Sequence, residues 1–457
     1  MNKGKVLTEV RSPQRQLAPD KVGSEQGEPT FLRGIATKAK SNKRHRFRDL
    51  YRCLNEALVY RAWETLNKSA ASGVDQVTAE AYAEDLHGNI QRLVERLKTK
   101  RYRAKLVRRV YIPKENGKQR PLGIPALEDR LIQSAVTKVL TAIYEQDFVD
   151  CSYGYRVGRS AHDAVSELTK GLQFGPYHTV VEADIRSFFD HMDHDWLLRI
   201  LEQRIDDRAF LGLIRKWLKA GILETDGNVI NPETGTPQGG IVSPILANVY
   251  LHYVLDLWFE RVVKKSCRGK AILTRYADDW VCAFEHKDDA ERFYQTLPKR
   301  LKKFGLEIAP EKTNLLLFSR RCLRKGQRFI FVGFEFYWES DRKGQPRVKR
   351  RTAPKKLQGA SRRIKAWIKK ERHLSKSDFV RGLNRRLTGH YNYFGIIGNG
   401  RSINRFYLWA MECTFKWLNR RGGKRQSFTR DTFWRAVDRG LFRKPRINAG
   451  MPRRVLV

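Results

Sequence analysis

Two adjacent aspartates, Asp278 and Asp279, stand between the short apolar runs Ala271–Leu273 and Val281–Phe284. Apolar runs on both sides of a polar turn are typical of a β-hairpin, so the two carboxylates are predicted at its tip. Hairpin turns favour Asn-Gly or Asp-Gly, because glycine accepts a positive φ, and a bare Asp-Asp pair is a poor turn by that standard. Neighbouring carboxylates repel each other unless a cation lies between them, which indicates a cation-binding role.

A third carboxylate, Asp184, follows the β-branched stretch Thr179–Val181. The stretch predicts a strand, and helical patterning resumes near Asp195, so Asp184 falls where a strand passes into a turn. An isolated Asp-Asp pair is more often a solvated turn, but a third carboxylate at Asp184 favours a cation-binding site instead. Packed beside the hairpin, this strand would bring Asp184 and Asp278 to one sheet edge, an oxygen-rich site that suits Mg²⁺. Two Mg²⁺ ions about 3.5 to 4 Å apart can activate a 3′-hydroxyl and stabilise the leaving pyrophosphate in phosphoryl transfer.

Further stretches show patterns of their own. Arg108–Pro125 joins two β-branched segments through Glu-Asn-Gly, which predicts a second hairpin, dense in cations. The string Pro-Gln-Gly-Gly-x-x-Ser-Pro at 237–244 contains paired glycines that permit another group to approach the backbone closely. The segments Phe304–Thr313 and Phe331–Phe336 are two further motifs. These motifs and their order along the chain resemble the reverse transcriptases of bacterial group II introns.

The resemblance implies roles for individual residues. The three aspartates would bind two Mg²⁺ ions, with Asp279 ligating or orienting one ion and the carbonyl of Ile185 completing a shell. In the basic hairpin, Lys114 and Arg120 would grip the triphosphate of a deoxynucleotide, with Lys118 in reserve. Without the resemblance, an exposed basic hairpin accounts for the same charges equally well.

Other residues of the motifs would contact the nucleotide and the template. Phe189, five residues beyond the first aspartate, would lie under the sugar and exclude a 2′-hydroxyl, although Phe188 and Phe189 are both candidates for the core. Gln238 would hydrogen-bond to sugar or base. Arg156 and Arg159 would contact template phosphates.

The composition is that of a nucleic-acid-binding protein. The 457 residues include 90 Lys and Arg against 49 Asp and Glu, a formal net charge of +41, which favours a polyanionic partner. A membrane partner is not expected, since the sequence has neither an apolar run of transmembrane length nor a signal-peptide core after its polar start. A cytoplasmic protein is predicted, associated with the nucleoid when it acts on DNA. The six scattered cysteines form no Cys-x-x-Cys pair, so neither disulfides nor zinc are expected.

The chain from about Pro354 is helical, basic and aromatic. Apolar residues of its first helix fall near one face while cations, among them Lys365, crowd the rest. Arg385, Arg386 and Tyr391 belong to a stretch that interleaves cations with rings, as RNA-binding surfaces do. The block resembles the thumb and maturase domain of the intron proteins.

Two parts of this block have a different interpretation. The aromatic residues of 406–417 are equally candidates for the core, and about half of them are expected there. The basic tail 422–457 resembles only the family's DNA-binding segment, and without paired cysteines or histidines the family's endonuclease is expected to be absent.

The predicted fold is of the α+β class, a right-hand polymerase with fingers, an antiparallel-sheet palm and a helical thumb. A flexible basic segment is expected at 1–45, where no apolar periodicity is evident, followed by an N-terminal extension and fingers at 46–175. The palm is expected at 176–340, the thumb and maturase domain at 341–421, and the tail at 422–457. Basic residues near 38–46 are either a solvated face or phosphate contacts.

The predicted function is RNA-templated DNA synthesis, combined with binding of the intron RNA to assist splicing and retromobility. The expected partners are group II intron RNA, a DNA target or primer and deoxynucleotides. One alternative is a host-adopted reverse transcriptase for defence or repair, without an intron. A second is an RNA-binding splicing factor that no longer polymerises, which the intact carboxylates disfavour.

Overall fold

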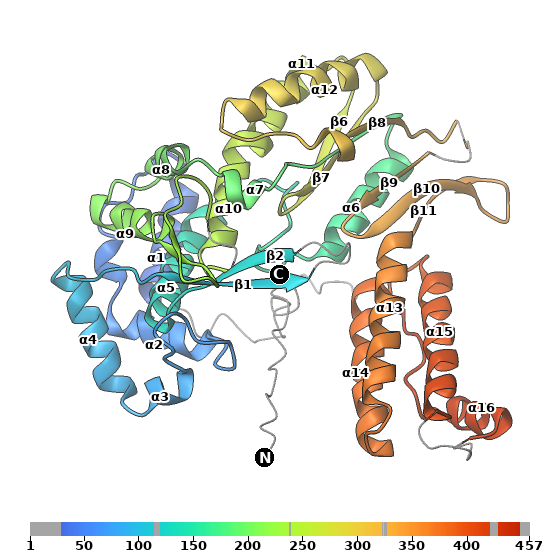
Figure 1. Cartoon of the computed structure of the whole chain (residues 1–457). Coiled ribbons are helices and arrows are strands. Elements are labelled where there is room, and N and C mark those ends of the chain that lie inside the picture. The colour runs from blue at the N-terminus through green and yellow to red at the C-terminus, as the bar shows by residue number, and fades with distance from the viewer. Residues whose placement is uncertain are drawn as a thin grey trace. The chain divides into compact units, whose positions relative to one another are not determined.

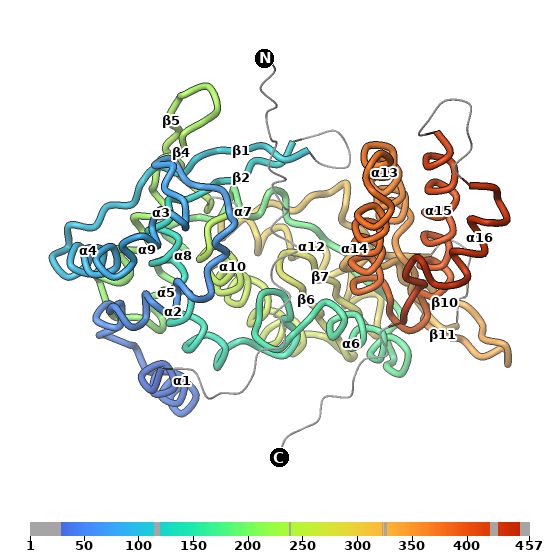
Figure 2. Tube along the Cα trace, turned by 90° about the horizontal axis from the view of Figure 1, so that it is seen from below, coloured from blue at the N-terminus to red at the C-terminus, as the bar shows by residue number. Residues whose placement is uncertain are grey.

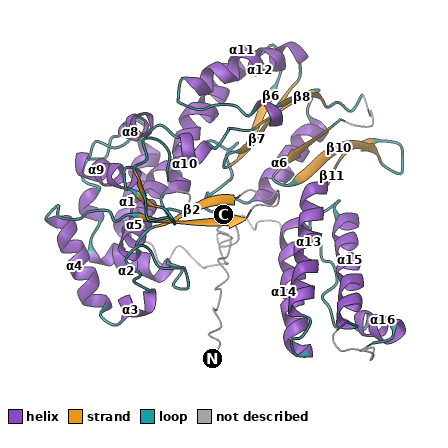
Figure 3. Ribbon diagram, viewed as in Figure 1, coloured by secondary structure: helices purple, strands orange, loops and turns teal. Residues whose placement is uncertain are grey.

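The computed structural model describes residues 29–113, 119–236, 239–321, 323, 327–420 and 428–447. Lys114, Lys118 and Gln238 lie outside these ranges. Helices and strands are mixed, and most strand pairs are antiparallel (Figure 3), so the α+β class is confirmed. The chain divides into two compact units, the first comprising 1–167 with 183–315 and the second 168–182 with 316–457. The division into five predicted segments stays a prediction.

Helix α5, Leu127–Tyr144, is the central helix of the N-terminal part of the first unit. Its apolar residues from Leu131 to Ile143 are almost completely buried, and helices α1, Thr30–Ser41, and α2, Glu56–Thr65, pack against it. Helices α3, Ala79–Ala83, and α4, Leu86–Lys98, lie between α2 and α5 in the sequence.

Helix α1 corrects the expectation of a flexible segment at 1–45 for residues 30–41, whereas residues 1–28 lie outside the described ranges. Leu32 and Ala39 are buried, and Ile35 and Ala36 between them are half-buried on the same helical face. This apolar spacing is helical but short, and the polar residues around it hid the pattern in the sequence.

The basic hairpin is confirmed. Strands β1, Val107–Pro113, and β2, Gln119–Ile124, are antiparallel with Tyr111 opposite Pro121, and they run side by side in Figures 1 and 2. Strand β4, Ile222–Leu223, joins β1 in parallel and pairs with β5, Val229–Ile230, giving the sheet order β2-β1-β4-β5.

Several helices of the first unit lie between the strands in the sequence. They are α7, Phe188–His191; α8, His194–Glu202; α9, Arg208–Leu218; and α10, Ser243–Leu251. After α10 the helix continues with wider π-helical turns at His252–Asp256 and Phe259–Val263, then α11, Lys264–Ser266.

The predicted hairpin around the aspartates is also confirmed. Strand β6, Ala271–Tyr276, pairs antiparallel with β7, Asp279–Phe284. Every residue of β7 after Asp279 is buried, and helix α12, Lys287–Lys302, packs against β7. Strand β7 is therefore a core strand along almost its whole length.

Three elements cross the boundary between the units in sequence: α6, Ala161–Phe174; β3, Thr179–Ala183; and β8, Asn314–Leu317. The second unit continues with the antiparallel sheet β11-β10-β9, formed by β9, Arg328–Phe331; β10, Phe334–Ser340; and β11, Pro346–Thr352. Val332 and Gly333 make the tight turn between β9 and β10, both with positive φ.

The rest of the second unit is helical. Helices α13, Pro354–Glu371, α14, Lys376–Phe394, and α15, Gly400–Leu418, run side by side (Figure 1), and α16, Arg430–Asp438, follows. The apolar face predicted for α13 is confirmed, since Ile364 and Ile368 are buried in this core and Trp367 packs against it. Within the described ranges, no helix combines the length and the apolar character that a membrane crossing requires.

Candidate active site

The turn between β6 and β7 has only two residues, Ala277 and Asp278, because Tyr276 pairs with Asp279. Ala277 has φ +57°, a left-handed conformation that costs a residue with a Cβ about 1 to 2 kcal/mol. The expected Asp-Asp tip is therefore refined: Asp278 lies in the turn, and Asp279 begins strand β7. The strain is local to the residue that precedes Asp278.

The segment around Gly154 lies directly against this turn. The backbone N–H of Tyr153 donates to Arg275 O at 2.8 Å, and Arg275 N–H donates to Cys151 O at 2.8 Å. A Cβ placed on Gly154 would lie 2.3 Å from the backbone nitrogen of Ala277. Only glycine allows two backbones to approach this closely without displacement.

Asp184 is held by a backbone pairing with the segment before Lys312. Ala309 N–H donates to Asp184 O at 2.8 Å, and Arg186 N–H donates to Glu307 O at 2.9 Å. Ile185, which lies between these two hydrogen bonds, uses its carbonyl in neither. The ammonium of Lys312 donates to the carboxylate of Asp184, and the Asp184 side chain is 32% exposed.

Electrostatic coupling shows that Asp184, Asp278 and Lys312 lie near one another. Burial, and after it the charge of Asp184, raises the pKa of Asp278, while Arg120 and Arg275 oppose the rise. The hydrogen bond to Asp184 is the largest effect that raises the pKa of Lys312, and Asp278 adds to it. Two carboxylates that are close in a partly desolvated place favour any cation between them.

These carboxylates fit a magnesium ion in part. Mg²⁺ is usually bound by one or two carboxylates together with water and substrate phosphates, and Asp184 and Asp278 supply such a pair. Within the described part of the chain, no three His, Cys, Asp or Glu side chains form a group that could hold a metal by themselves. The role of Asp279 as a ligand or orienting residue stays a prediction.

The loop that contains the paired glycines is anchored at both ends. Before it, Thr236 N–H donates to Phe189 O at 2.8 Å, His194 Nε2 donates to Gly235 O at 2.5 Å, and the hydroxyl of Thr236 bonds that of Ser243 at 2.7 Å. Gly239 has φ +123°, and a Cβ there would lie 2.3 Å from Gly123 O of β2. The loop is thereby attached to the residue proposed to contact the sugar and to the basic hairpin.

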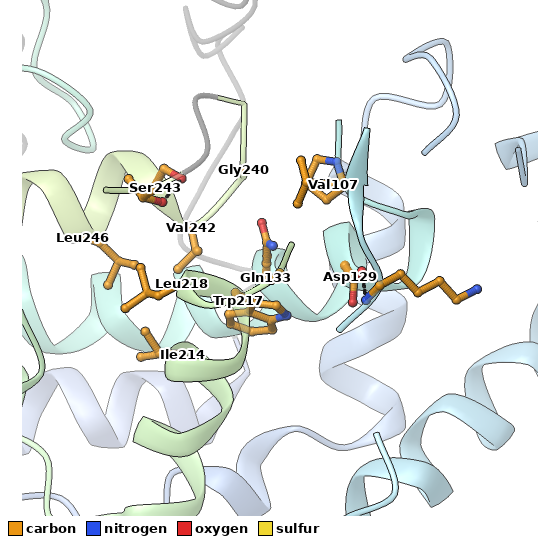
Figure 4. Close-up of a pocket in the computed structure, with 14 residues that line it drawn as sticks. Val107, Asp129, Gln133, Ile214, Trp217, Leu218, Gly240, Val242, Ser243 and Leu246 are labelled. Atoms are coloured by element: carbon orange, nitrogen blue, oxygen red, sulfur yellow. Dashed lines mark hydrogen bonds between the residues drawn. The ribbon is translucent and has the colours of Figure 1, made fainter. Parts of the chain in front are cut away.

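A small cavity of about 10 Å³ lies beneath this loop, room for one water molecule (Figure 4). Gln133 of α5 lines it, and its Oε1 accepts the N–H of Ile241 at 2.9 Å. Asp129, also in the lining, accepts the hydroxyl of Tyr102, which in turn accepts Trp217 Nε1–H at 2.9 Å. The loop thus rests on a hydrogen-bonded layer of α5 and α9.

The two phenylalanines after Asp184 differ in how deeply their side chains are buried. Phe188 is 2% exposed, whereas Phe189 is half-buried, with the ring centroids 5.3 Å apart. Phe188 therefore belongs to the core and supports the ring of Phe189 edge-on.

Arg156 requires a correction, because its guanidinium is used inside the protein. It donates to the carboxylate of Glu145 at 3.0 Å and to the carbonyls of Val149 and Ser152 at 2.8 and 2.9 Å, and its side chain is only 4% exposed. It braces its own loop and is not accessible to a template phosphate. Arg159 is 22% exposed and bonds Asp150, so its role toward the template stays a prediction.

Tyr391 is also corrected. It is 3% exposed in the helical core of the second unit, where its hydroxyl donates to Arg443 O at 3.2 Å. Arg386 is half-buried over the ring of Trp367 at 4.2 Å and donates to Gly382 O. Of the four candidates in this block, Lys365 and Arg385 are exposed.

Lys312 and Arg275 are the site residues that sequence reasoning did not single out. Lys312 lies in the string Phe304–Thr313, so a cation within a recognised motif was the available signal. Arg275 precedes Tyr276 in the hairpin, but the side chains that accept its hydrogen bonds lie 19 to 123 residues away. No local pattern could have indicated them.

Comparison with known proteins identifies the family of this chain. Residues 112–336 match the reverse transcriptase (RNA-dependent DNA polymerase) family. The group II intron-encoded protein LtrA of Lactococcus lactis subsp. cremoris is 41% identical over 236 residues, which are 50% of this chain and 38% of LtrA. Protein YkfC of Escherichia coli is 33% identical over 351 residues, which are 69% of this chain and 90% of YkfC. The chain belongs to the group II intron reverse transcriptase family.

The relatives of this chain also include a protein that is named as an intron maturase. Nuclear intron maturase 1 of Arabidopsis thaliana is 30% identical over 95 residues, 21% of this chain and 13% of that protein. The chain spans less than two fifths of the length of LtrA, at 38%. The matched region contains the β6–β7 turn, Asp184 and the anchored loop.

Proposed function

We propose that this member of the reverse transcriptase family is an RNA-directed DNA polymerase whose active centre is built on Asp184 and Asp278. The observation that carries the proposal is the coupling of these two carboxylates around the ammonium of Lys312, at the end of a strained two-residue turn. A raised carboxyl pKa beside a second carboxylate is a physical sign of a site that binds cations.

Different residues of the chain would bind the metal and the triphosphate during nucleotide addition. Asp184 and Asp278 would hold Mg²⁺, with Asp279 and the carbonyl of Ile185 as further ligands. Bound Mg²⁺ would lower the barrier to attack of the primer 3′-hydroxyl on the α-phosphate and stabilise the pyrophosphate that leaves. Arg120, whose charge acts on Asp278, would bind the triphosphate together with Lys114.

The loop and Phe189 would place the nucleotide. Gln238 would contact its sugar or base, and the ring of Phe189, supported by Phe188, would fill the space beside C2′. In this arrangement residues 46–175 supply the N-terminal extension and the fingers of a right-hand polymerase, residues 176–340 its palm, and helices α13 to α15 belong to its thumb.

A second surface would hold structured intron RNA, and the seam between α13 and α15 is the part of the helical block best suited to it. Lys369, Arg372 and Arg420 surround the ring of Trp417 at 5.4, 5.6 and 5.4 Å. Farther along the same seam, Trp409 is 44% exposed, and its Nε1–H donates to Ser361 O of α13 at 3.4 Å. A surface that presents cations together with an exposed ring can combine phosphate contact with base stacking.

The test is primer extension by the purified chain on an RNA template with Mg²⁺. The expected result is RNA-templated incorporation of deoxynucleotides that stops when the metal is chelated. Tight binding of RNA without any incorporation, on several primers and with Mn²⁺ as well as Mg²⁺, would contradict the proposal and favour an RNA-binding splicing factor.

A further inference from the structure

We infer that Arg275 is a positioning residue for polymerisation: its buried guanidinium fixes the peptide that carries Asp278. The inference rests on the proposed role of Asp278. Arg275 itself is too deeply buried to touch a substrate, and it acts through the turn.

The guanidinium of Arg275 donates hydrogen bonds to several elements of the first unit. Nε and Nη2 donate to the two carboxylate oxygens of Asp256 at 2.7 and 2.6 Å. Nη1 donates to Asn248 Oδ1 and to Ala277 O, both at 2.9 Å, and Nη2 also donates to Ser152 Oγ at 2.7 Å. The planar fork of arginine can satisfy such a set, whereas a lysine ammonium cannot.

The contact with Ala277 is the one that reaches the active centre. The oxygen of Ala277 and the nitrogen of Asp278 belong to the same rigid peptide plane. Holding that oxygen therefore sets the orientation from which the Asp278 side chain projects. Because Ala277 is left-handed at φ +57°, the turn needs such support to keep its conformation.

Asn248, a hydrogen-bond partner of Arg275, connects it to the segment that packs against the same turn. Asn248 accepts from Arg275 and donates through Nδ2 to Gly154 O at 2.6 Å, and Gly154 is the residue whose backbone meets Ala277. One network thus holds the turn from its inner side and fixes the segment packed against it.

Burial indicates that the network has a use beyond stability. The side chains of Arg275 and Asp256 are both 0% exposed, and a buried ion pair is often no more stabilising than a well-packed apolar pair. Asp256 ends the π-helical turn His252–Asp256, a local widening of the helix that is frequent at functional sites.

His252 leaves the charge balance of this pair unchanged. Burial, and then the charge of Arg275, lowers the pKa of His252 to about 3, so the ring is neutral at physiological pH. The buried network therefore contains one cation and one anion, and its geometry does not change between pH 5 and 8 through His252.

The test compares Arg275→Lys with Arg204→Lys. Arg204 is a matched control, because its side chain is 3% exposed, forms an ion pair with Asp147 at 2.8 Å and donates to the carbonyls of Ala39, Asn42 and His45. These partners belong to the N-terminal part of the first unit and not to the turn, so Arg204→Lys should lower the melting temperature and leave polymerisation by the folded protein unchanged.

Four quantities are measured well below both melting temperatures. They are the single-turnover extension rate with its Mg²⁺ midpoint, the dissociation constant for primer–template, and backbone cleavage near residue 278 by Fe²⁺ with ascorbate. Misplacement of a reacting group by about 1 Å can cost roughly a hundredfold in rate. Arg275→Lys should lower the rate about tenfold or more, raise the Mg²⁺ midpoint and weaken the cleavage, with primer–template binding unchanged.

Arg275→Lys overturns the inference if it behaves like Arg204→Lys in rate, midpoint and cleavage. Should Arg275→Lys fail to fold, Asn248→Ala takes its place, since it keeps both buried charges and removes the link to Gly154. Asp278→Asn in the same assay distinguishes a failure of the proposed active centre from a failure of the inference about Arg275. Full activity of Asp278→Asn contradicts the proposed active centre, whereas its inactivity with a normal Arg275→Lys contradicts only the inference about Arg275.

Discussion

At the scale of single residues, the site concentrates charge that is unfavourable where it stands. Burial raises the pKa of Asp278, Asp184 lies near enough to add to that rise, and Lys312 donates to Asp184. Such an arrangement costs free energy unless a cation relieves it. A need for a carboxylate in the turn also explains its Ala-Asp sequence, in which Ala277 is left-handed. The sequence Asn-Gly would form such a turn with less strain.

Phe189 gives a prediction at this scale. Replacing Phe189 by Val should open space at the position that we propose for C2′ of the nucleotide, because the ring is half-buried and held edge-on by Phe188. The preference for a deoxynucleotide over its ribonucleotide, measured as a ratio of kcat/KM values, should fall by roughly tenfold or more. Phe188→Leu is the control and should lower stability with the ratio retained. An unchanged ratio in Phe189→Val would assign the discrimination to another residue.

Sequence reasoning at this scale succeeded where chemistry is concentrated in one motif and failed where partners are distant. The coupling of Asp184 with Asp278 agrees with the sheet-edge hypothesis, although their catalytic role stays a prediction. Arg156 and Tyr391 were misassigned because a basic, aromatic chain offers no local sign of burial. Only folding places Glu145 beside Arg156 and Arg443 beside Tyr391.

At the scale of elements, both hairpins were predictable because apolar or β-branched runs flank turn residues, and the registers of both hairpins confirm the prediction. Helix α1 was missed, since its apolar face is only a few residues long. The anchoring of the 235–243 loop was not predictable either. It depends on Gln133, His194 and the backbone approach of Gly239 to Gly123, which come from distant parts of the chain.

Asp129 provides a pH prediction for the layer beneath that loop. Burial raises the pKa of Asp129 from 3.8 to about 6, although the hydrogen bond from Tyr102 opposes the rise. Because the folded pKa exceeds the unfolded one, this group's contribution to stability is fully present below about pH 4 and is lost as pH rises through about 6. The size of the shift corresponds to roughly 2 to 3 kcal/mol.

The free energy of unfolding, measured in urea from pH 4.5 to 7 for the wild type and Asp129→Asn, tests this sign. The wild type should lose stability relative to Asp129→Asn as pH rises, since every other titrating group is common to both proteins. A parallel pair of curves, or a wild type that gains on the variant, would show that Asp129 is ionised in the folded protein at pH 5.

At the scale of the whole molecule, the dominant property is a net charge of +41. Such a charge predicts strong binding to any nucleic acid, so specific contacts must be separated from the general field. The composition could predict the kind of partner, but only the structure indicates which cations lie around an aromatic ring, as at the half-buried Trp417.

The proposed RNA surface is tested by the triple variant Lys365→Ala, Lys369→Ala and Arg420→Ala. For every phosphate that the variant no longer neutralises, the slope of log affinity against log salt should fall by about 0.7 to 0.9, and splicing assistance should decrease while extension of a short primer continues. The control removes the exposed cations Lys299, Lys302 and Lys303 of the α12 region, which changes the net charge equally. Equal losses in both triples would mean that overall charge, and not the α13–α15 seam, holds the RNA.

Single-nucleotide extension of a DNA primer on an RNA template by Asp278→Asn decides whether the active centre is built on the β6–β7 turn. This change keeps the shape of the side chain and removes its charge, so the fold and primer–template binding should persist. We predict a loss of rate of at least about a thousandfold, as expected when several kcal/mol of metal-assisted stabilisation disappears. A matched change in the β4–β5 loop, Asp226→Asn, should leave the rate intact. Extension by Asp278→Asn at close to the wild-type rate would contradict the assignment of the active centre to this turn.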